Sequence, residues 1–150
     1  MMIFSPLSGE RAPLSSIDDV AFSQKLLGDG VGVRPAGSII TAPVDGHVVM
    51  TFPTKHAIGL KSDAGVEILI HVGLDTVGMA GDGFDLLVET GQRVSVGDPL
   101  LTFDRDKIVA AQCDLVTVMI ITNTDEFSEI KQIGTSWLEA GDPVLEAVAK

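Results

Sequence analysis

The sequence has little of what secreted, membrane and nucleic-acid-binding proteins contain in quantity. Cys113 is the only cysteine, so no disulfide can form within the chain, and a cytoplasmic location is the expectation. No apolar run approaches the roughly 18 residues of a membrane span, and the first residues lack the basic head and apolar segment of a secretory signal. Basic residues are few, with 10 Lys and Arg against 21 Asp and Glu and a net charge of −11. Such a surface disfavours nucleic acid and membrane insertion, and it favours a basic protein partner.

The residues that are present predict a fold of short strands. With 150 residues, of which 45% are apolar, the chain suits one domain spanning 1–150. Turn-forming residues interrupt the apolar segments about every eight to twelve residues, which is typical of antiparallel sandwiches and barrels. We therefore expect an all-β, antiparallel β-sandwich of barrel-like shape, with short helical turns only within 17–23 and 104–113. Strands are predicted within residues 28–35, 39–53, 54–76, 85–88, 90–103 and 115–121, and those within 39–53 are expected to form a hairpin about the turn at Asp45-Gly46.

Two turns of the same composition suggest an internal pseudo-repeat. Gly97-Asp98-Pro99 and Gly141-Asp142-Pro143 are each followed by two aliphatic residues. The glycine-rich segment 28–35, in contrast, does not predict a nucleotide site, because neither G-x-G-x-x-G nor G-K-[ST] is present.

The stretch from Thr54 to Thr76 predicts a hairpin that brings together two of the three histidines. Its turn formers are Ser62-Asp63-Ala64-Gly65. If the turn is centred between Asp63 and Ala64, His56 and His71 face each other across the antiparallel pair. Directly opposed residues share a sheet face with Cβ atoms roughly 4.5–5.5 Å apart. The sequence therefore predicts a histidine pair, provided that the register does not slip.

Two adjacent imidazoles have a definite chemistry. Because double protonation of the pair is disfavoured, at least one ring is neutral at pH 7 and carries a free nitrogen lone pair. That ring can act as a nucleophile or a metal ligand, and its neighbour can hydrogen-bond an anion attached to the first. The Thr54 hydroxyl can orient the neighbour through its second nitrogen. The alternative interpretation is that both histidines are ordinary residues of amphipathic strands.

The order of several motifs resembles the glucose-family IIA phosphocarrier of the bacterial sugar phosphotransferase system. The resemblance runs from about Val20 to the C-terminus, and its most specific parts are T-x-H-A at Thr54–Ala57 and H-x-G-x-D-T-V at His71–Val77. It is continued by Leu27-Gly28-Asp29-Gly30, Ala42-Pro43-Val44-Asp45-Gly46, Gly65-Val66-Glu67, Gly83-Phe84, Gly91-Gln92-x-Val94-x-x-Gly97-Asp98 and Ile121-x-Asn123. The resemblance implies an antiparallel β-sandwich that carries phosphate.

The resemblance also implies a role for each matched residue. His71 matches the histidine that accepts a phosphoryl group from HPr and passes it to a cysteine on the IIB domain of a membrane sugar permease. His56 matches the histidine that steadies the phosphate, and Thr54 the threonine bonded to it. Asp19 and Asp75 match acids that receive a basic side chain of HPr. An apolar rim around the histidines is implied for Val20, Phe22, Phe52 and Val77.

Some of these residues also have simpler interpretations. Asp75 suits a turn after a strand, and Phe22 and Phe52 suit an ordinary core. Gly59 and Gly78 stand where some family members have larger or charged residues, which affects the expected rim. No cofactor is implied, and nothing indicates an obligate dimer, so we expect a monomer. Met1 favours a free-standing chain, although a module cut from a permease fusion would have the same sequence.

Two other functions compete with a phosphocarrier. A zinc hydrolase would need His56, His71 and a third ligand, for which His47 and Asp75 are the candidates, but neither H-x-H nor H-E-x-x-H is present. Adventitious zinc on the His56 and His71 pair is the more plausible metal chemistry. Lipoyl and biotinyl domains also use short strands, and Asp106-Lys107-Ile108 superficially resembles their modified lysine. Those domains are about half this length and have no use for a histidine pair.

Overall fold

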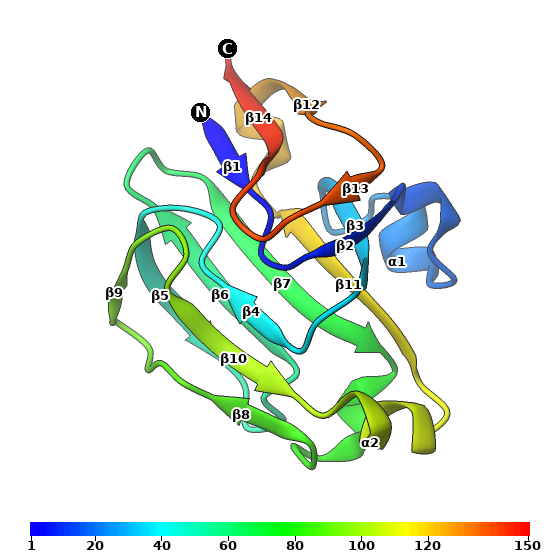
Figure 1. The fold of residues 1–150 in the computed structure, drawn as a ribbon. Helices are drawn as coiled ribbons and strands as arrows, with labels where there is room; N and C mark the ends of the chain where they lie inside the picture. Colours follow the sequence, from blue (N-terminus) through cyan, green and yellow to red (C-terminus); the bar gives the residue numbers. More distant parts are fainter.

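Three antiparallel sheets build the protein, which a computed structural model describes over residues 1–150 (Figure 1). The largest has the strand order β13-β2-β3-β11-β7-β6-β5-β9, and two smaller sheets have the orders β1-β14-β12 and β4-β10-β8. The expected all-β antiparallel class is confirmed, but the strands do not close into a barrel. The strands are β1 (Met2–Phe4), β2 (Gly9–Ala12), β3 (Asp29–Pro35), β4 (Ile39–Thr41), β5 (Gly46–Thr51), β6 (Ala57–Ser62), β7 (Glu67–Leu74), β8 (Phe84–Leu86), β9 (Arg93–Val94), β10 (Pro99–Phe103), β11 (Asp114–Ile121), β12 (Phe127–Gln132), β13 (Trp137–Leu138) and β14 (Pro143–Ala149).

Helical structure is confined to short segments. The two α-helices, α1 (Val20–Ser23) and α2 (Arg105–Ala110), lie inside the two predicted helical ranges. Three single turns of 3-10 helix are η1 (Leu14–Ser16), η2 (Thr76–Met79) and η3 (Thr124–Glu126). No helix is long and apolar enough to cross a lipid bilayer.

The main core lies between the large sheet and the two small ones. Strand β11 illustrates how the sequence builds it, because its side chains alternate between the two faces of the sheet. Met119 and Ile121 enter the main cluster with residues of the small sheets such as Leu101 and Leu145. The alternate residues of β11 form a second cluster on the outer face of the large sheet. A strand that is buried on both faces has a nearly continuous run of apolar residues, and residues 115–121 form such a run.

The strand orders show an approximate two-fold repeat. The large sheet reads β13-β2-β3-β11 on one side of its centre and β9-β5-β6-β7 on the other, and each small sheet accompanies one half. The two matching turns have equivalent contacts. The Asp98 carboxylate accepts from the Ser95 amide at 2.9 Å, and the Asp142 carboxylate accepts from the Glu139 amide at 2.9 Å. The expected internal pseudo-repeat is therefore present in the fold.

The two halves differ in what covers the outer face of the large sheet. The connection between β2 and β3, residues 13–28, contains η1 and α1 and packs Leu14, Ile17 and Phe22 on Val118 and its neighbours. The corresponding connection between β5 and β6, residues 52–56, is short. Figure 1 shows α1 beside β3 and β11 at one end of this face. The outer face near β6 and β7 consequently has no cover of its own.

Two details of the predicted strand pattern are wrong. The segments on either side of Asp45-Gly46 do not form a hairpin, because β4 pairs with β10 while β5 pairs with β6 and β9. Strand β12 was not predicted, since four of the six residues in its sequence F-S-E-I-K-Q are polar and its two apolar residues are only partly buried. Pairing with β14 rather than side-chain burial places it in a sheet.

Candidate functional site

The histidine pair forms at the end of the β6–β7 hairpin, but not in the predicted register. His71 pairs with Ala57, not with His56. The turn is a three-residue loop in which Gly65 has φ +92° and donates from its amide to the Ser62 carbonyl, so its centre lies at Ala64. The two rings still meet, with centroids 4.8 Å apart and planes at 81°.

The chain leaves regular strand geometry just before β6, which explains how the rings meet. Lys55 has φ +58°, and His56 lies in a bend one residue before the strand begins. The alternation of side chains between the two faces therefore does not extend to His56. Its carbonyl still accepts from the Val72 amide at 2.8 Å, which holds the bend against β7.

His71 has a fixed tautomer. Its Nδ1 lies 2.8 Å from the carbonyl oxygen of Gly73, and because a carbonyl only accepts, Nδ1 carries the proton. In the neutral ring Nε2 then has the free lone pair. Gly73 has φ +74°, and a Cβ added there would lie 2.5 Å from Thr76 Cγ2 and 2.7 Å from the Asp114 carbonyl oxygen. A glycine is therefore required at the position that orients His71.

His56 is held by a partner that can serve either tautomer. Its side chain is only 6% exposed, and its Nδ1 lies 2.8 Å from the Thr54 hydroxyl. A hydroxyl both donates and accepts, so Nε2 of His56 can be a donor or an acceptor without any movement of Thr54. The structure thus brings the predicted Thr54, His56 and His71 into one group.

Both rings are electrically neutral near pH 7. Burial lowers the pKa of His71, an effect that the Gly73 hydrogen bond and the charges of Asp19 and Asp75 partly offset. Burial also lowers the pKa of His56, with a further contribution from the nearby His71. A neutral imidazole with an exposed lone pair is a competent nucleophile, which an imidazolium is not.

Two phenylalanines flank the pair, one at each ring. Phe22 of α1 meets His71 edge to face, with ring centroids 5.4 Å apart, and Phe52 lies 5.9 Å from His56. Phe22 is also 4% exposed and part of the outer core cluster, so its core interpretation holds as well. Val20 and Val77 are 68% and 56% exposed, which leaves their side chains free to meet a partner.

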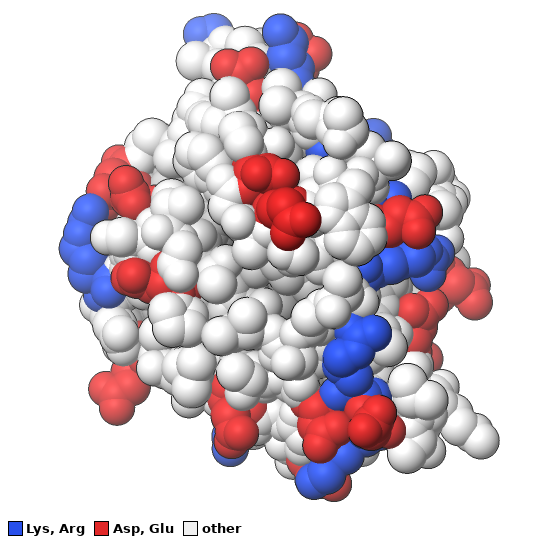
Figure 2. Space-filling model, in the orientation of Figure 1, with Lys and Arg blue, Asp and Glu red and all other residues white.

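The two acids predicted to dock a partner lie at the ends of the elements that border His71. Asp19 is the N-cap of α1, where its carboxylate accepts from the Ala21 amide at 2.9 Å. Asp75 follows β7 with φ +62° and precedes η2, as its turn interpretation predicts. Both also act electrostatically on His71. Figure 2 shows acidic side chains at several places along the margin of one face and near its centre, with basic side chains interspersed.

Sequence reasoning missed an apolar groove that begins at Phe52. It measures about 480 Å³ and is lined by Val49, Met50, Leu69 and neighbouring residues of β5, β6 and β7. Val49 and Met50 are 42% and 51% exposed. The sequence feature that could have revealed the groove is the run Val48-Val49-Met50. It interrupts the alternation of apolar and polar residues that is expected of a strand with one solvent-exposed face. This groove occupies the uncovered half of the outer face.

The residues proposed for metal or lysine chemistry are not assembled. No group of three His, Cys, Asp or Glu side chains is placed to share a metal ion, so neither His47 nor Asp75 completes a zinc site. His47 is instead exposed on β5. Lys107 lies in helix α2 and pairs with Asp82 at 2.8 Å, whereas a swinging-arm lysine needs the tip of a hairpin. The lipoyl-domain interpretation is therefore wrong.

Comparisons with known proteins agree with this geometry. The family model described as phosphoenolpyruvate-dependent sugar phosphotransferase system, EIIA 1, matches residues 1–127. The glucose-specific EIIA component of the PTS system of Staphylococcus aureus strain MRSA252 is 45% identical over 128 residues, which cover 85% of this chain and 77% of the relative. The same component of strain Mu50 / ATCC 700699 gives the same identity and coverage. The solved structure of glucose permease IIA from Mycoplasma capricolum has a TM-score of 0.88 and 33% identity, covering 97% of this chain and 94% of that one. The chain therefore belongs to the EIIA 1 family of the phosphoenolpyruvate-dependent sugar phosphotransferase system.

Proposed function

We propose that the protein is a phosphocarrier that accepts a phosphoryl group from HPr on Nε2 of His71 and transfers it to the IIB cysteine of a membrane sugar permease. The observation that carries the proposal is the hydrogen bond from His71 Nδ1 to the Gly73 carbonyl, because it leaves Nε2 as the nucleophile. The relatives are named glucose-specific, so a glucose permease is the first acceptor to test. We place this relay in the cytoplasm, with one monomeric domain over 1–150.

Each phosphoryl-transfer step forms one bond to phosphorus and breaks one. As the bond from phosphorus to the HPr donor atom breaks, its electron pair leaves with that atom, and the Nε2 lone pair of His71 forms the new bond. In the second step the IIB thiolate attacks the phosphorus, and the electron pair of the broken bond returns to Nε2. Phosphoryl transfer relies mainly on positioning and on stabilising charge. The fixed tautomer of His71 supplies the positioning.

His56 and Thr54 have the role of stabilising the phosphate. Once His71 carries a phosphoryl group, a hydrogen bond from His56 Nε2 requires its proton to be on that nitrogen. Thr54 then donates to Nδ1, which a hydroxyl can do by rotating its O–H bond. The ring centroids are 4.8 Å apart, which supports this role of His56 beside the reacting ring.

The apolar surroundings have two uses in this proposal. Phe22 and Phe52 limit the access of water to the phosphoryl group, which favours its survival until the acceptor arrives. The groove at Phe52 and the exposed Val20 and Val77 offer apolar contacts to HPr and IIB. Asp19 and Asp75 lie beside this surface and attract a basic partner, since complementary charge steers association.

The experiment that tests the proposal measures two steps separately: uptake of phosphate from HPr and transfer of phosphate to IIB. The purified protein is incubated with HPr, the first enzyme of the system and phosphoenolpyruvate, and its phosphate is measured by intact mass spectrometry. We expect His71→Gln to take up none, and His56→Gln to take up one phosphate but transfer it to IIB poorly. His47→Gln, which alters the exposed third histidine, is the matched control and behaves as the unaltered protein. Equal loss of uptake in the His56 and His71 variants would contradict the assigned roles.

A further inference from the structure

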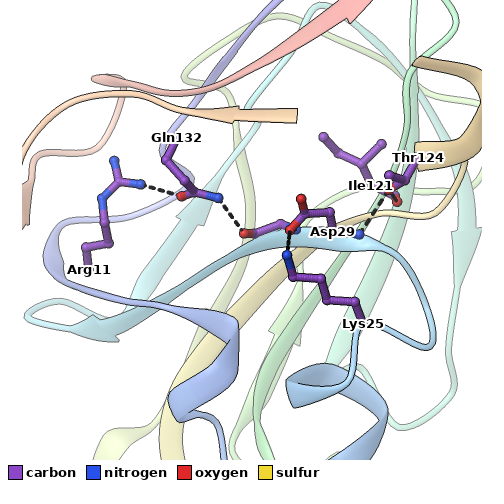
Figure 3. Close-up of polar contacts among 7 residues, drawn as sticks. Arg11, Lys25, Asp29, Ile121, Thr124 and Gln132 are labelled. Atoms are coloured by element: carbon purple, nitrogen blue, oxygen red, sulfur yellow. Dashed lines mark hydrogen bonds and ion pairs between the residues drawn. The ribbon is translucent and has the colours of Figure 1, made fainter. Parts of the chain in front are cut away.

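A small hollow with several charged and polar residues in its lining lies beside the β2–β3 connection. It measures about 280 Å³, and its walls include Arg11 of β2, Lys25 after α1, Asp29 of β3 and Gln132 of β12. Figure 3 shows these four side chains coming from separate elements, with Arg11 bonded to Gln132 and Lys25 paired with Asp29. None of them belongs to the group around His71, so the hollow has no part in the proposed transfer.

Arg11 has no acidic partner. Its guanidinium donates to Gln132 Oε1 at 2.7 Å, to the Thr135 carbonyl at 3.1 Å and to the Ile133 carbonyl. The four ion pairs of the protein do not include it. A guanidinium has five N–H groups, so two remain for another acceptor. An arginine that is partly buried without a counter-charge is unusual, because such charges are normally paired.

Lys25 adds a second cation that is only partly neutralised. Its Nζ lies 3.4 Å from Asp29 Oδ1, and that oxygen also accepts from the Gly30 amide at 2.8 Å. With two cations and one carboxylate, the hollow has a formal charge of +1 in a protein whose net charge is −11. The Ser15 side chain at the rim offers one more donor.

The donors are held in place by neighbouring strands. Gln132 accepts from Arg11 with its oxygen and donates from Nε2 to the Gly30 carbonyl at 3.0 Å, which links β12, β2 and β3. The Asp29 amide donates to Thr124 Oγ1 at 2.9 Å, and that hydroxyl donates to the Ile121 carbonyl at 2.6 Å (Figure 3). A site whose donors are already ordered binds more tightly, because less entropy is lost on binding.

We propose that this hollow binds a small anion of the phosphate class, either inorganic phosphate or the phosphate group of a small metabolite. Arg11 would donate from the two N–H groups that its present contacts leave free, and Lys25 would contribute a point charge. The volume is below the range of drug-sized pockets, roughly 300–1,000 Å³, and suits a ligand of this size.

The test is a titration of the ¹⁵N-labelled protein with inorganic phosphate at constant ionic strength, followed by NMR. We expect saturable shifts at the amides of Arg11, Lys25 and Gly30, and at least a tenfold weaker affinity for Arg11→Gln and for Lys25→Gln. Lys25→Gln leaves the carbonyl contacts of Arg11 intact, so it remains informative if Arg11→Gln does not fold. The matched control is Arg34→Gln, which removes an exposed arginine of β3 that does not line the hollow.

The titration distinguishes free phosphate from a phosphorylated metabolite, and it distinguishes the hollow from other binding sites. If glucose 6-phosphate binds more tightly than inorganic phosphate at the same amides, the ligand is a metabolite; the reverse order indicates free phosphate. Either order supports the site. Absence of saturable shifts, or shifts that disappear in His71→Gln but persist in Lys25→Gln, would overturn it, since phosphate would then bind at the histidines or nowhere. The titration requires no phosphotransfer partner, so its failure would leave the proposed function standing.

Discussion

At the scale of single residues, the account depends on how His71 is oriented. The sequence motif H-x-G-x-D-T-V includes the glycine, but the sequence alone does not say what the glycine does. In the structure, Gly73 turns its carbonyl toward His71 Nδ1 and leaves no room for a side chain. The sequence correctly predicted that the two histidines form a pair, although the register used to predict it was one residue off.

Gly73→Ala is predicted to impair both stability and phosphate uptake. The new Cβ would overlap Thr76 and the Asp114 carbonyl, and alanine disfavours the left-handed backbone by about 1–2 kcal/mol. We expect a loss in the free energy of unfolding of about 3 kcal/mol, measured by urea denaturation, because overpacking adds about 1–3 kcal/mol. Uptake of phosphate at His71 should slow in the same variant, because the carbonyl that fixes its tautomer moves.

Gly91→Ala provides the control for Gly73→Ala. Gly91 has a similar φ of +91°, but no atom lies within 4 Å of the added Cβ. Its variant should lose only the backbone contribution, about 1–2 kcal/mol, and keep its normal uptake. Equal uptake by the two variants would show that the Gly73 carbonyl does not govern the chemistry of His71.

At the scale of elements, the short helix α1 contributes both to the stability of the fold and to the surface on which we expect HPr to dock. Asp19 begins the helix, Phe22 packs on His71, and the rest of the connection covers the outer core. Acids followed by apolar residues predicted a capped helical turn in this range, and the structure confirms it. The paired strands were harder to predict, because Asp63, Ala64 and Gly65 are compatible with either a two-residue or a three-residue loop. The positive φ of Gly65 decides between them, and a sequence contains no dihedral angles.

Substitutions of Asp19 can separate its two roles. Asp19→Asn keeps a good N-cap but removes the charge, so we expect stability to change little while HPr binds more weakly. The loss should be larger at low salt than at high salt, because ions screen the charge interaction. Asp19→Ala should lose, in addition, about 1 kcal/mol of stability. Binding can be measured by calorimetry at two salt concentrations, and a loss in Asp19→Asn that is independent of salt would contradict the electrostatic role.

At the scale of the whole molecule, the fold is an approximate repeat whose halves have diverged. One half carries the residues 13–28 that cover its outer face, and the other leaves an apolar groove next to Phe52. Two short turns of the same sequence suggested the repeat. Its extent could not be predicted, because most equivalent strands have the same place in the sheet order but different sequences. The residues proposed for function gather where the covered and uncovered halves meet, at β7 and α1.

The neutral histidines predict how stability depends on pH. Their native pKa values are lowered, while in the unfolded chain a histidine titrates near 6.5. As the pH falls below about 6.5, the unfolded chain therefore binds more protons than the native protein, and stability decreases until the native pKa values are reached. Each unit of lowering amounts to about 1.4 kcal/mol.

Urea unfolding between pH 7 and pH 5 measures this dependence. The double variant with His56→Gln and His71→Gln should show a smaller decrease in the free energy of unfolding than the unaltered protein over this interval. His47→Gln, which removes an exposed histidine, should retain the decrease. If the double variant lost as much stability as the unaltered protein on acidification, the two rings would not be buried neutral groups.

The most direct test of the central claim is to locate the phosphoryl group by atom. After phosphorylation through HPr, peptide mapping under alkaline conditions identifies the residue, and ³¹P–¹⁵N coupling in histidine-labelled protein identifies the nitrogen. The account predicts a single phosphate on Nε2 of His71, because Nδ1 is engaged by the Gly73 carbonyl. Phosphate on Nδ1 of His71, or on His56, would contradict it.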